Sequence, residues 1–259
     1  MTGQPATKSP ELLNQINTLS AKDRDNAILL KRLKREASQV LATGEVASGY
    51  TLLGALAAMR GNAEETRSYH AKAVAAAPSD PAIFRNFAIS LLRVGLIDEA
   101  ISMADRSWRL DQSQNDNFNL LVQLTCHGGR IQEAVNLVHA CNLTGLNSSR
   151  VAELEDAASL LAKNGVSDQI AGAIARAAIE VVAPISISGV DNRIATDDES
   201  TWVDFTFLVN DSTERVIELN RAFADRMAEL TLDSEISRAS SPFVVRFTRN
   251  VGLDAGIAH

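Results

Sequence analysis

The spacing of hydrophobic positions along this 259-residue chain changes once, and the change divides the chain into two parts. From Pro10 to residue 183, apolar residues recur mostly three and four positions apart, which is typical of amphipathic helices. From residue 184 onwards, apolar and polar residues alternate in short runs around one further helical stretch, which is typical of half-buried strands. The pattern predicts a mainly α protein that ends in a small α+β domain.

The helical part contains a motif that returns at a fixed interval. It reads GNAEET at residue 61, GLIDEA at 95 and GRIQEA at 129, which places the copies 34 residues apart. Copies that begin at Ala47, Pro81 and Asn115 therefore align without an insertion. They share an aromatic residue (Tyr50, Phe84, Phe118), a glycine (Gly61, Gly95, Gly129) and a glutamate (Glu65, Glu99, Glu133). Agreement in several columns and in one phase indicates an internal repeat.

Each shared column has a mechanical role in a helical hairpin. Glycine ends the first helix in a left-handed conformation that other residues resist, and the second helix begins two or three residues later. A small residue at position 8 of the repeat, such as Gly54 or Ala88, lets the two helices approach closely. Because one hairpin cannot bury both of its faces, the pattern predicts that the three hairpins stack into a solenoid.

This column signature resembles the tetratricopeptide repeat (TPR) family over residues 47–146. The chain departs from the family pattern at Thr66, where alanine is usual, and at Gln112 and Leu146, where proline is common. The resemblance implies a solenoid whose first helices line a concave groove, and it implies that the groove binds a peptide or a protein segment.

Helical segments on both sides of the repeats complete the predicted domain organisation. Residues 1–46 form helices that pack on the first edge of the array, and residues 147–183 form a helical pair. That pair is either a cap on the array, which we favour, or the first part of the next domain. Residues 184–259 form the terminal domain.

The terminal domain is predicted to have the order β-β-α-β. Strands at 184–195 and 201–210 flank the polar turn TDDES, which is a hairpin signature, and a third strand covers 242–250. The intervening helix begins at the capping-box pair Asp211 and Glu214. It should cover one side of a small antiparallel or mixed sheet.

Composition narrows the partners and the compartment. A formal net charge of -7 gives no general attraction to nucleic acid or to anionic lipid, so we expect neither as a partner. No segment approaches the roughly 18 uninterrupted apolar residues of a membrane-spanning helix, and the N-terminus lacks the apolar core of a signal peptide. The two cysteines, Cys126 and Cys141, form no disulfide framework, which favours a reducing, cytoplasmic location.

Candidate catalytic and metal-binding residues are sparse. No serine lies in a nucleophile-elbow motif and no glycine-rich loop joins a strand to a helix, so the sequence predicts neither an enzyme nor a bound cofactor. His127 and His139 lie close to the two cysteines, but their spacings are not those of a tetrahedral metal site, and no metal is expected. His70 falls at a repeat position that normally holds a bulky packing residue, so it should pack between helices.

The resemblance also implies which residues face a partner. The first repeat would present Thr51, Ala55 and Met59 in the groove, and the third would add Cys126. The predicted partner-binding set is Arg85, Asn86, Ile89 and Arg93 from the second repeat with Asn119, Gln123 and His127 from the third. Of the residues that hold a C-terminal carboxylate in one TPR subclass, only Asn86 has a counterpart, so binding of a chaperone tail is not expected. Arg85 and Arg93 would either hold an acidic segment or be ordinary solvated side chains.

Three functions remain open at this level. The one we favour is a protein–protein interaction scaffold whose terminal domain binds a second partner or forms a homodimer by strand addition at its sheet. A second is that the terminal domain binds a small ligand or is an enzyme. Trp202, Asp204, Arg246 and Arg249 would then line its site, or else form an exposed sheet face or a dimer interface. A third is an acidic protein that neutralises a basic toxin or effector.

Overall fold

The computed structural model divides the chain into two compact units, Met1–Gln112 and Ser113–His259, which are described in turn. The residues that the structure describes are 9–19, 21–141, 148–182, 187–196, 201–209, 211–231, 236–237 and 242–249. The end of the third repeat at 142–146, the polar turn at 197–200 and the outermost predicted strand residues at 184–186, 210 and 250 lie outside these ranges.

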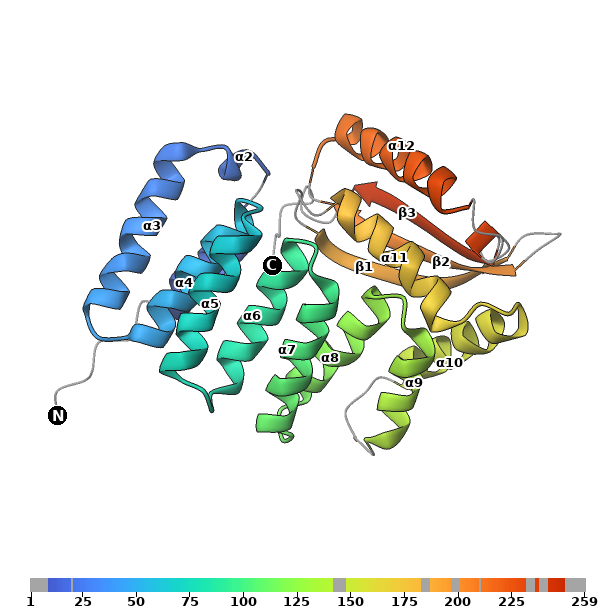
Figure 1. Cartoon of the computed structure of the whole chain (residues 1–259), viewed down its shortest axis with the longest axis horizontal. Helices are drawn as coiled ribbons and strands as arrows, with labels where there is room; N and C mark the ends of the chain where they lie inside the picture. The colour runs from blue at the N-terminus through green and yellow to red at the C-terminus, as the bar shows by residue number, and fades with distance from the viewer. Residues whose placement is uncertain are drawn as a thin grey trace, which may run out of the picture. The chain divides into compact units, whose positions relative to one another are not determined.

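The first unit consists of packed helices (Figure 1). Its elements are α1 (Ser9–Asn17), α2 (Ala21–Arg24), α3 (Ala27–Ala42), α4 (Val46–Met59), α5 (Ala63–Ala76), α6 (Pro81–Arg93) and α7 (Ile97–Leu110). α4 packs on α5 as one hairpin and α6 packs on α7 as the next, at the residues that the repeat predicts. The hairpins stack, since α6 also contacts α4 and α5, and α4 also contacts α3. The helical-hairpin prediction is therefore confirmed in this unit.

The repeat glycines adopt the conformation predicted for them. Gly61 and Gly95 have φ angles of 69° and 79°, in the left-handed region, and each comes two residues after the last residue of its first helix. The next residue after Gly61 is Asn62, which caps α5 by accepting a hydrogen bond from the backbone N–H of Glu65 (3.0 Å). The hairpin turn therefore combines a glycine stop with a polar start.

His70 of α5 packs both within its own hairpin and against the next one. The residue is fully buried, and its ring stacks on Phe87 of α6 with centroids 4.8 Å apart and planes inclined by 9°. A Cβ atom on Gly54 of α4 would lie 2.4 Å from Cδ2 of this ring, so the glycine leaves room for the imidazole. Neither ring nitrogen has a hydrogen-bond partner in the described part of the chain. The prediction that His70 packs between helices is confirmed.

The second unit combines helices with a three-stranded sheet (Figure 1). Its elements are α8 (Asn115–His127), α9 (Ile131–Ala140), α10 (Ser148–Lys163), α11 (Asp168–Val182), β1 (Ile187–Thr196), β2 (Thr201–Val209), α12 (Thr213–Leu230) and β3 (Phe243–Arg249). The predicted order β-β-α-β is confirmed for the last four of them. α8 and α9 form the third hairpin at the predicted residues, with the left-handed glycine Gly129 (φ 71°) between them.

The sheet is mixed and has the order β1-β2-β3. β1 runs antiparallel to β2, with Ile194 opposite Val203, and β3 runs parallel to β2 after the crossover through α12. Side chains at Val203, Phe205 and Phe207 of β2 are fully buried on one face, as the alternating pattern predicts. Phe223 of α12 packs edge-on against Phe247 of β3, which lies beside Phe207 in the sheet. This contact places α12 on the apolar face.

The helical pair α10 and α11 joins the third hairpin to the sheet. α10 contacts α9, β1 and β2, and α11 contacts α9, α12 and β3. Each helix therefore packs both on the last repeat and on the terminal domain, which are the two roles that the sequence leaves open for residues 147–183.

The start of α12 differs from the prediction by one residue. Ser212 is the N-cap, and its Oγ accepts a hydrogen bond from the backbone N–H of Arg215 (3.2 Å). Asp211, the predicted cap, instead accepts from the backbone N–H of Ser212 (2.7 Å). Serine and aspartate are both favoured caps, so sequence preference alone could not separate the two neighbouring residues.

Asn220 of α12 covers part of the free edge of β3. Its Oδ1 accepts a hydrogen bond from the backbone N–H of Phe247 (3.1 Å), and its Nδ2 donates to the backbone carbonyl of Phe247 (3.0 Å). One side-chain amide thus satisfies a donor and an acceptor that would otherwise be open to an added strand. Strand addition at this edge would have to displace Asn220.

We expect Asn220→Leu to destabilise the second unit by about 1–3 kcal/mol, because both edge groups of Phe247 lose their partner. The variant should also increase the self-associated fraction, since the β3 edge becomes open. Denaturant unfolding and size-exclusion chromatography with light scattering measure the two effects. Arg221→Leu, an exposed change on the same helix, is the control. Equal stability and equal mass for the two variants would contradict the role of Asn220.

Candidate functional site

Three of the predicted partner-binding residues share one face of α6 in the first unit. Arg85, Asn86 and Ile89 are all half-buried, so each leaves part of its side chain accessible. In the described part of the chain, no hydrogen bond or ion pair is formed by the Arg85 guanidinium. This face therefore offers the Arg85 guanidinium, with its hydrogen-bond donors available, beside the Asn86 amide and the Ile89 side chain.

Arg93, the fourth predicted residue of α6, is occupied by the chain itself. One terminal nitrogen of its guanidinium donates to Oδ1 of Asn17 (2.7 Å), and the other lies 3.4 Å from the backbone carbonyl of Asn17 at the end of α1. Burial, together with the nearby positive charge of Arg24, lowers the pKa of Arg93 to about 10. Arg93 therefore does not present an open fork to a partner in this conformation, which corrects the expectation from the sequence.

The predicted groove residues of α4 are also covered. Thr51, Ala55 and Met59 are only 3%, 2% and 4% exposed. Ala55 and Met59 belong to one buried cluster with Leu12 and Ile16 of α1. The first repeat therefore does not present these side chains to a partner, and α1 is one of the helices that pack on α4.

In the second unit, the predicted residues of α8 divide into two kinds. Asn119 and Gln123 are exposed, whereas Cys126 and His127 are buried. Burial raises the pKa of the Cys126 thiol to about 12. Burial, and to a smaller extent the charge of Arg150, lowers the pKa of His127 to about 3. His127 is therefore a neutral internal ring rather than an accessible binding residue, which corrects the prediction for it.

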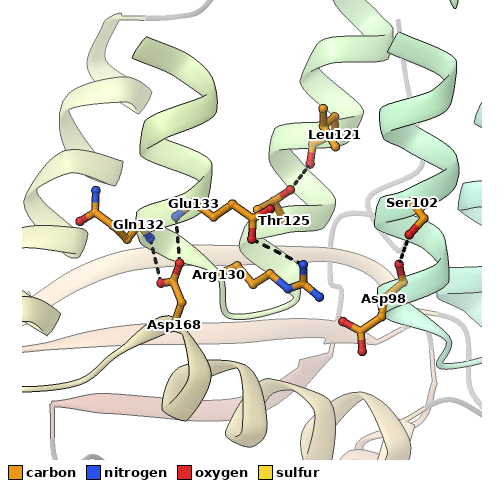
Figure 2. A network of polar contacts seen from close by, with 8 residues as sticks. All are labelled: Asp98, Ser102, Leu121, Thr125, Arg130, Gln132, Glu133 and Asp168. Carbon is orange, nitrogen blue, oxygen red and sulfur yellow. Dashed lines mark hydrogen bonds and ion pairs between the residues drawn. The ribbon is translucent and has the colours of Figure 1, made fainter. Parts of the chain in front are cut away.

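A network at the start of α9 was not anticipated from the sequence (Figure 2). Asp168, the first residue of α11, accepts hydrogen bonds from the backbone N–H groups of Gln132 (2.9 Å) and Glu133 (2.8 Å). Arg130, the N-cap residue of α9, makes no side-chain cap. The Asp168 carboxylate, 36 residues after Gln132 in the sequence, takes that role. The carboxylate also suits the positive end of the helix dipole.

A shallow hollow of about 470 Å³ lies beside this cap, between the start of α9, the end of α10 and the turn that follows α10. Its lining includes the apolar residues Ile131, Leu161 and Val166 and the polar residues Gln132 and Asp168. Because the Asp168 carboxylate already accepts two backbone hydrogen bonds, its main role is to join α11 to α9.

The polar face of the sheet carries a closed network. Nε of Arg246 donates to Oγ1 of Thr206 (3.1 Å), and Oγ1 of Thr206 donates to Oδ1 of Asp204 (3.1 Å). A terminal nitrogen of Arg246 donates to the other oxygen of Asp204, which is 2% exposed. Two of the four residues suggested for a small-ligand site therefore bind each other, with half-exposed Arg246 covering the carboxylate.

The described residues contain no group of three or more histidine, cysteine, aspartate or glutamate side chains placed to hold a metal ion. None of the described helices has the length and hydropathy of a membrane span.

Comparison with protein-family models, with curated proteins and with solved structures finds no match to this chain. The fold is that of a mainly α protein of packed helical hairpins with a small three-stranded α/β region.

Proposed function

We propose that this protein is an interaction scaffold that binds a peptide or protein segment on the first helices of its repeats. The observation that supports it best is the face of α6, where Arg85, Asn86 and Ile89 are half-buried and the Arg85 fork is free of partners in the described part of the chain. The proposal includes membership of the TPR class, a cytoplasmic location and a binding rather than a catalytic role.

The chemistry of this face favours an acidic segment. A guanidinium pairs with a carboxylate through two parallel hydrogen bonds, and Arg85 has its donors available. Asn86 can bond to a peptide backbone through both its amide N–H and its carbonyl, and Ile89 supplies apolar contact. Mixed surfaces of this kind, partly buried before binding, lose little side-chain entropy when a partner arrives.

The second unit supports a further contact in the same proposal. Asn119 and Gln123 expose polar side chains on α8, and the sheet has β1 and β3 as its edge strands. Since Asn220 occupies the backbone groups of Phe247 on β3, a homodimer or a second partner would add its strand more easily at β1.

We expect Arg85→Glu to weaken partner binding about tenfold, because it replaces attraction for a carboxylate by repulsion. Affinity purification from the native host, followed by binding measurements with the purified partner, tests this. Arg109→Glu, the same charge reversal at an exposed site on α7, is the matched control. Equal partner binding by both variants would contradict the proposal.

A further inference from the structure

The first helix that the structure describes, α1, lies where a partner would lie. Leu12 and Ile16, four residues apart on one face of α1, are 6% and 0% exposed. They share a buried cluster with Ala55 and Met59, two residues that the resemblance to TPR proteins places in the groove. The polar end of α1 reaches the next repeat, since Asn17 binds Arg93 of α6. α1 therefore contacts the first helices of both repeats in this unit.

α1 depends on its contacts with the rest of the first unit, chiefly with α4 and α3. A nine-residue helix has no independent stability in water, so α1 is helical because of its contacts. Within the described residues, its side chains also form the pair Asn17–Arg93 and a hydrogen bond from the Ser9 hydroxyl to the carboxylate of Glu45 (2.7 Å). A few side chains on a short helix form a contact set that another helix can replace.

Asn17 gives the charged Arg93 guanidinium only neutral hydrogen-bond acceptors. Asn17 offers a neutral amide oxygen and a carbonyl to a guanidinium that is largely removed from water and lies near a second one, Arg24. A carboxylate at the same place would form charge-assisted hydrogen bonds, which are roughly twice as strong as neutral ones. It would also offset the repulsion between the two arginines.

We propose that α1 is a built-in occupant of the binding groove, and that the partner is an amphipathic helical segment that displaces it. The segment has large apolar residues four positions apart, as at Leu12 and Ile16, followed directly by aspartate or glutamate at the position of Asn17. This proposal rests on the proposed function, because it names the ligand of the same groove.

The in-chain test changes how tightly α1 is held. Asn17→Asp gives Arg93 a carboxylate from within the chain and should keep the groove closed. Asn17→Lys places a like charge against Arg93 and should open it. Asn14→Asp is the matched control, since it adds the same charge to the exposed side of α1.

The probe is a fluorescent peptide of residues 9–19 that carries the change Asn17→Asp, titrated against the full-length variants by anisotropy. The apparent affinity depends on the fraction of chains with an open groove. We expect Asn17→Asp to bind the probe about fivefold more weakly than wild type, and Asn17→Lys to bind it about fivefold more tightly. Asn14→Asp should match wild type, and Arg93→Gln should lose the preference for the Asn17→Asp peptide over the unmodified peptide.

Equal affinity of Asn17→Asp and Asn14→Asp for the probe would overturn the proposal, and so would a preference that survives Arg93→Gln. Failure of every variant to bind the probe would also overturn it. If partner recovery still depends on Arg85 in that case, the groove function stands and only α1 as its occupant is rejected. If recovery is independent of Arg85 as well, both proposals fail.

Discussion

Gly129→Ala is expected to destabilise the second unit by about 3–5 kcal/mol. Gly129 has a φ of 71°, where an L-residue is strained, and it lies against α11. A Cβ at this position would be 2.5 Å from the carbonyl oxygen and 2.6 Å from the carbonyl carbon of Ala171. Both are backbone atoms, so α11 would have to move away from the turn, and its contacts with the sheet would change with it.

The fluorescence of Trp202 in a Trp108→Phe background reports unfolding of the second unit, because these are the two tryptophans of the chain. Gly165→Ala is the matched control. Gly165 has the same φ of 71°, but a Cβ there would meet nothing within 4 Å, so only the conformational cost of about 1 kcal/mol should appear. Similar losses for the two variants would show that the approach of α11 to the turn contributes little.

The local features of the fold could be predicted because their causes lie within a few residues. The left-handed glycines, the alternation around Phe205 and the helical hairpins all follow from backbone conformation and side-chain periodicity. The predicted helix start at Asp211 was wrong by one residue, at a point where two good caps are adjacent.

The glutamate shared by the three repeats has a similar position in each hairpin but a different arginine partner. Glu65, Glu99 and Glu133 lie in the first turns of α5, α7 and α9, where a negative charge suits the helix dipole. All three are partly exposed, and each pairs with an arginine: Arg60, Arg67 and Arg130, respectively. The hydrogen bond from Arg67 lowers the pKa of Glu99. The repeat predicts the glutamate and its exposure, but not the arginine, because the arginines occupy different repeat positions.

The site was harder to predict because it depends on contacts between distant segments. Asn17 and Arg93 are 76 residues apart, and the cap that Asp168 provides for α9 spans 36. The residues around Asn17 and Asp168 do not indicate these contacts. In sequence, both look like ordinary asparagine and aspartate residues at the surface of a helix. The burial of His127 likewise depends on what packs around α8, which helical periodicity alone does not specify.

Acid should destabilise the first unit through His70. Burial lowers the pKa of His70 to about 3, whereas an unfolded chain has the ordinary value of about 6.5. Between these values the unfolded state binds the proton and the folded state does not, so stability is complete above pH 6.5 and falls as the pH decreases. The loss should reach about 2 kcal/mol at pH 5 and about 4 kcal/mol near pH 3.

The test compares the pH dependence of unfolding, followed by Trp108 in a Trp202→Phe background, for wild type and two variants. His70→Phe keeps a ring against Phe87 but cannot be protonated, so the decrease in stability between pH 6.5 and 4 should become shallower by the amount assigned to His70. Phe87→Leu keeps the imidazole and loses the stack, so it should lower stability at every pH and preserve the decrease. If His70→Phe keeps the full decrease, other groups cause the acid sensitivity and the buried ring has no part in it.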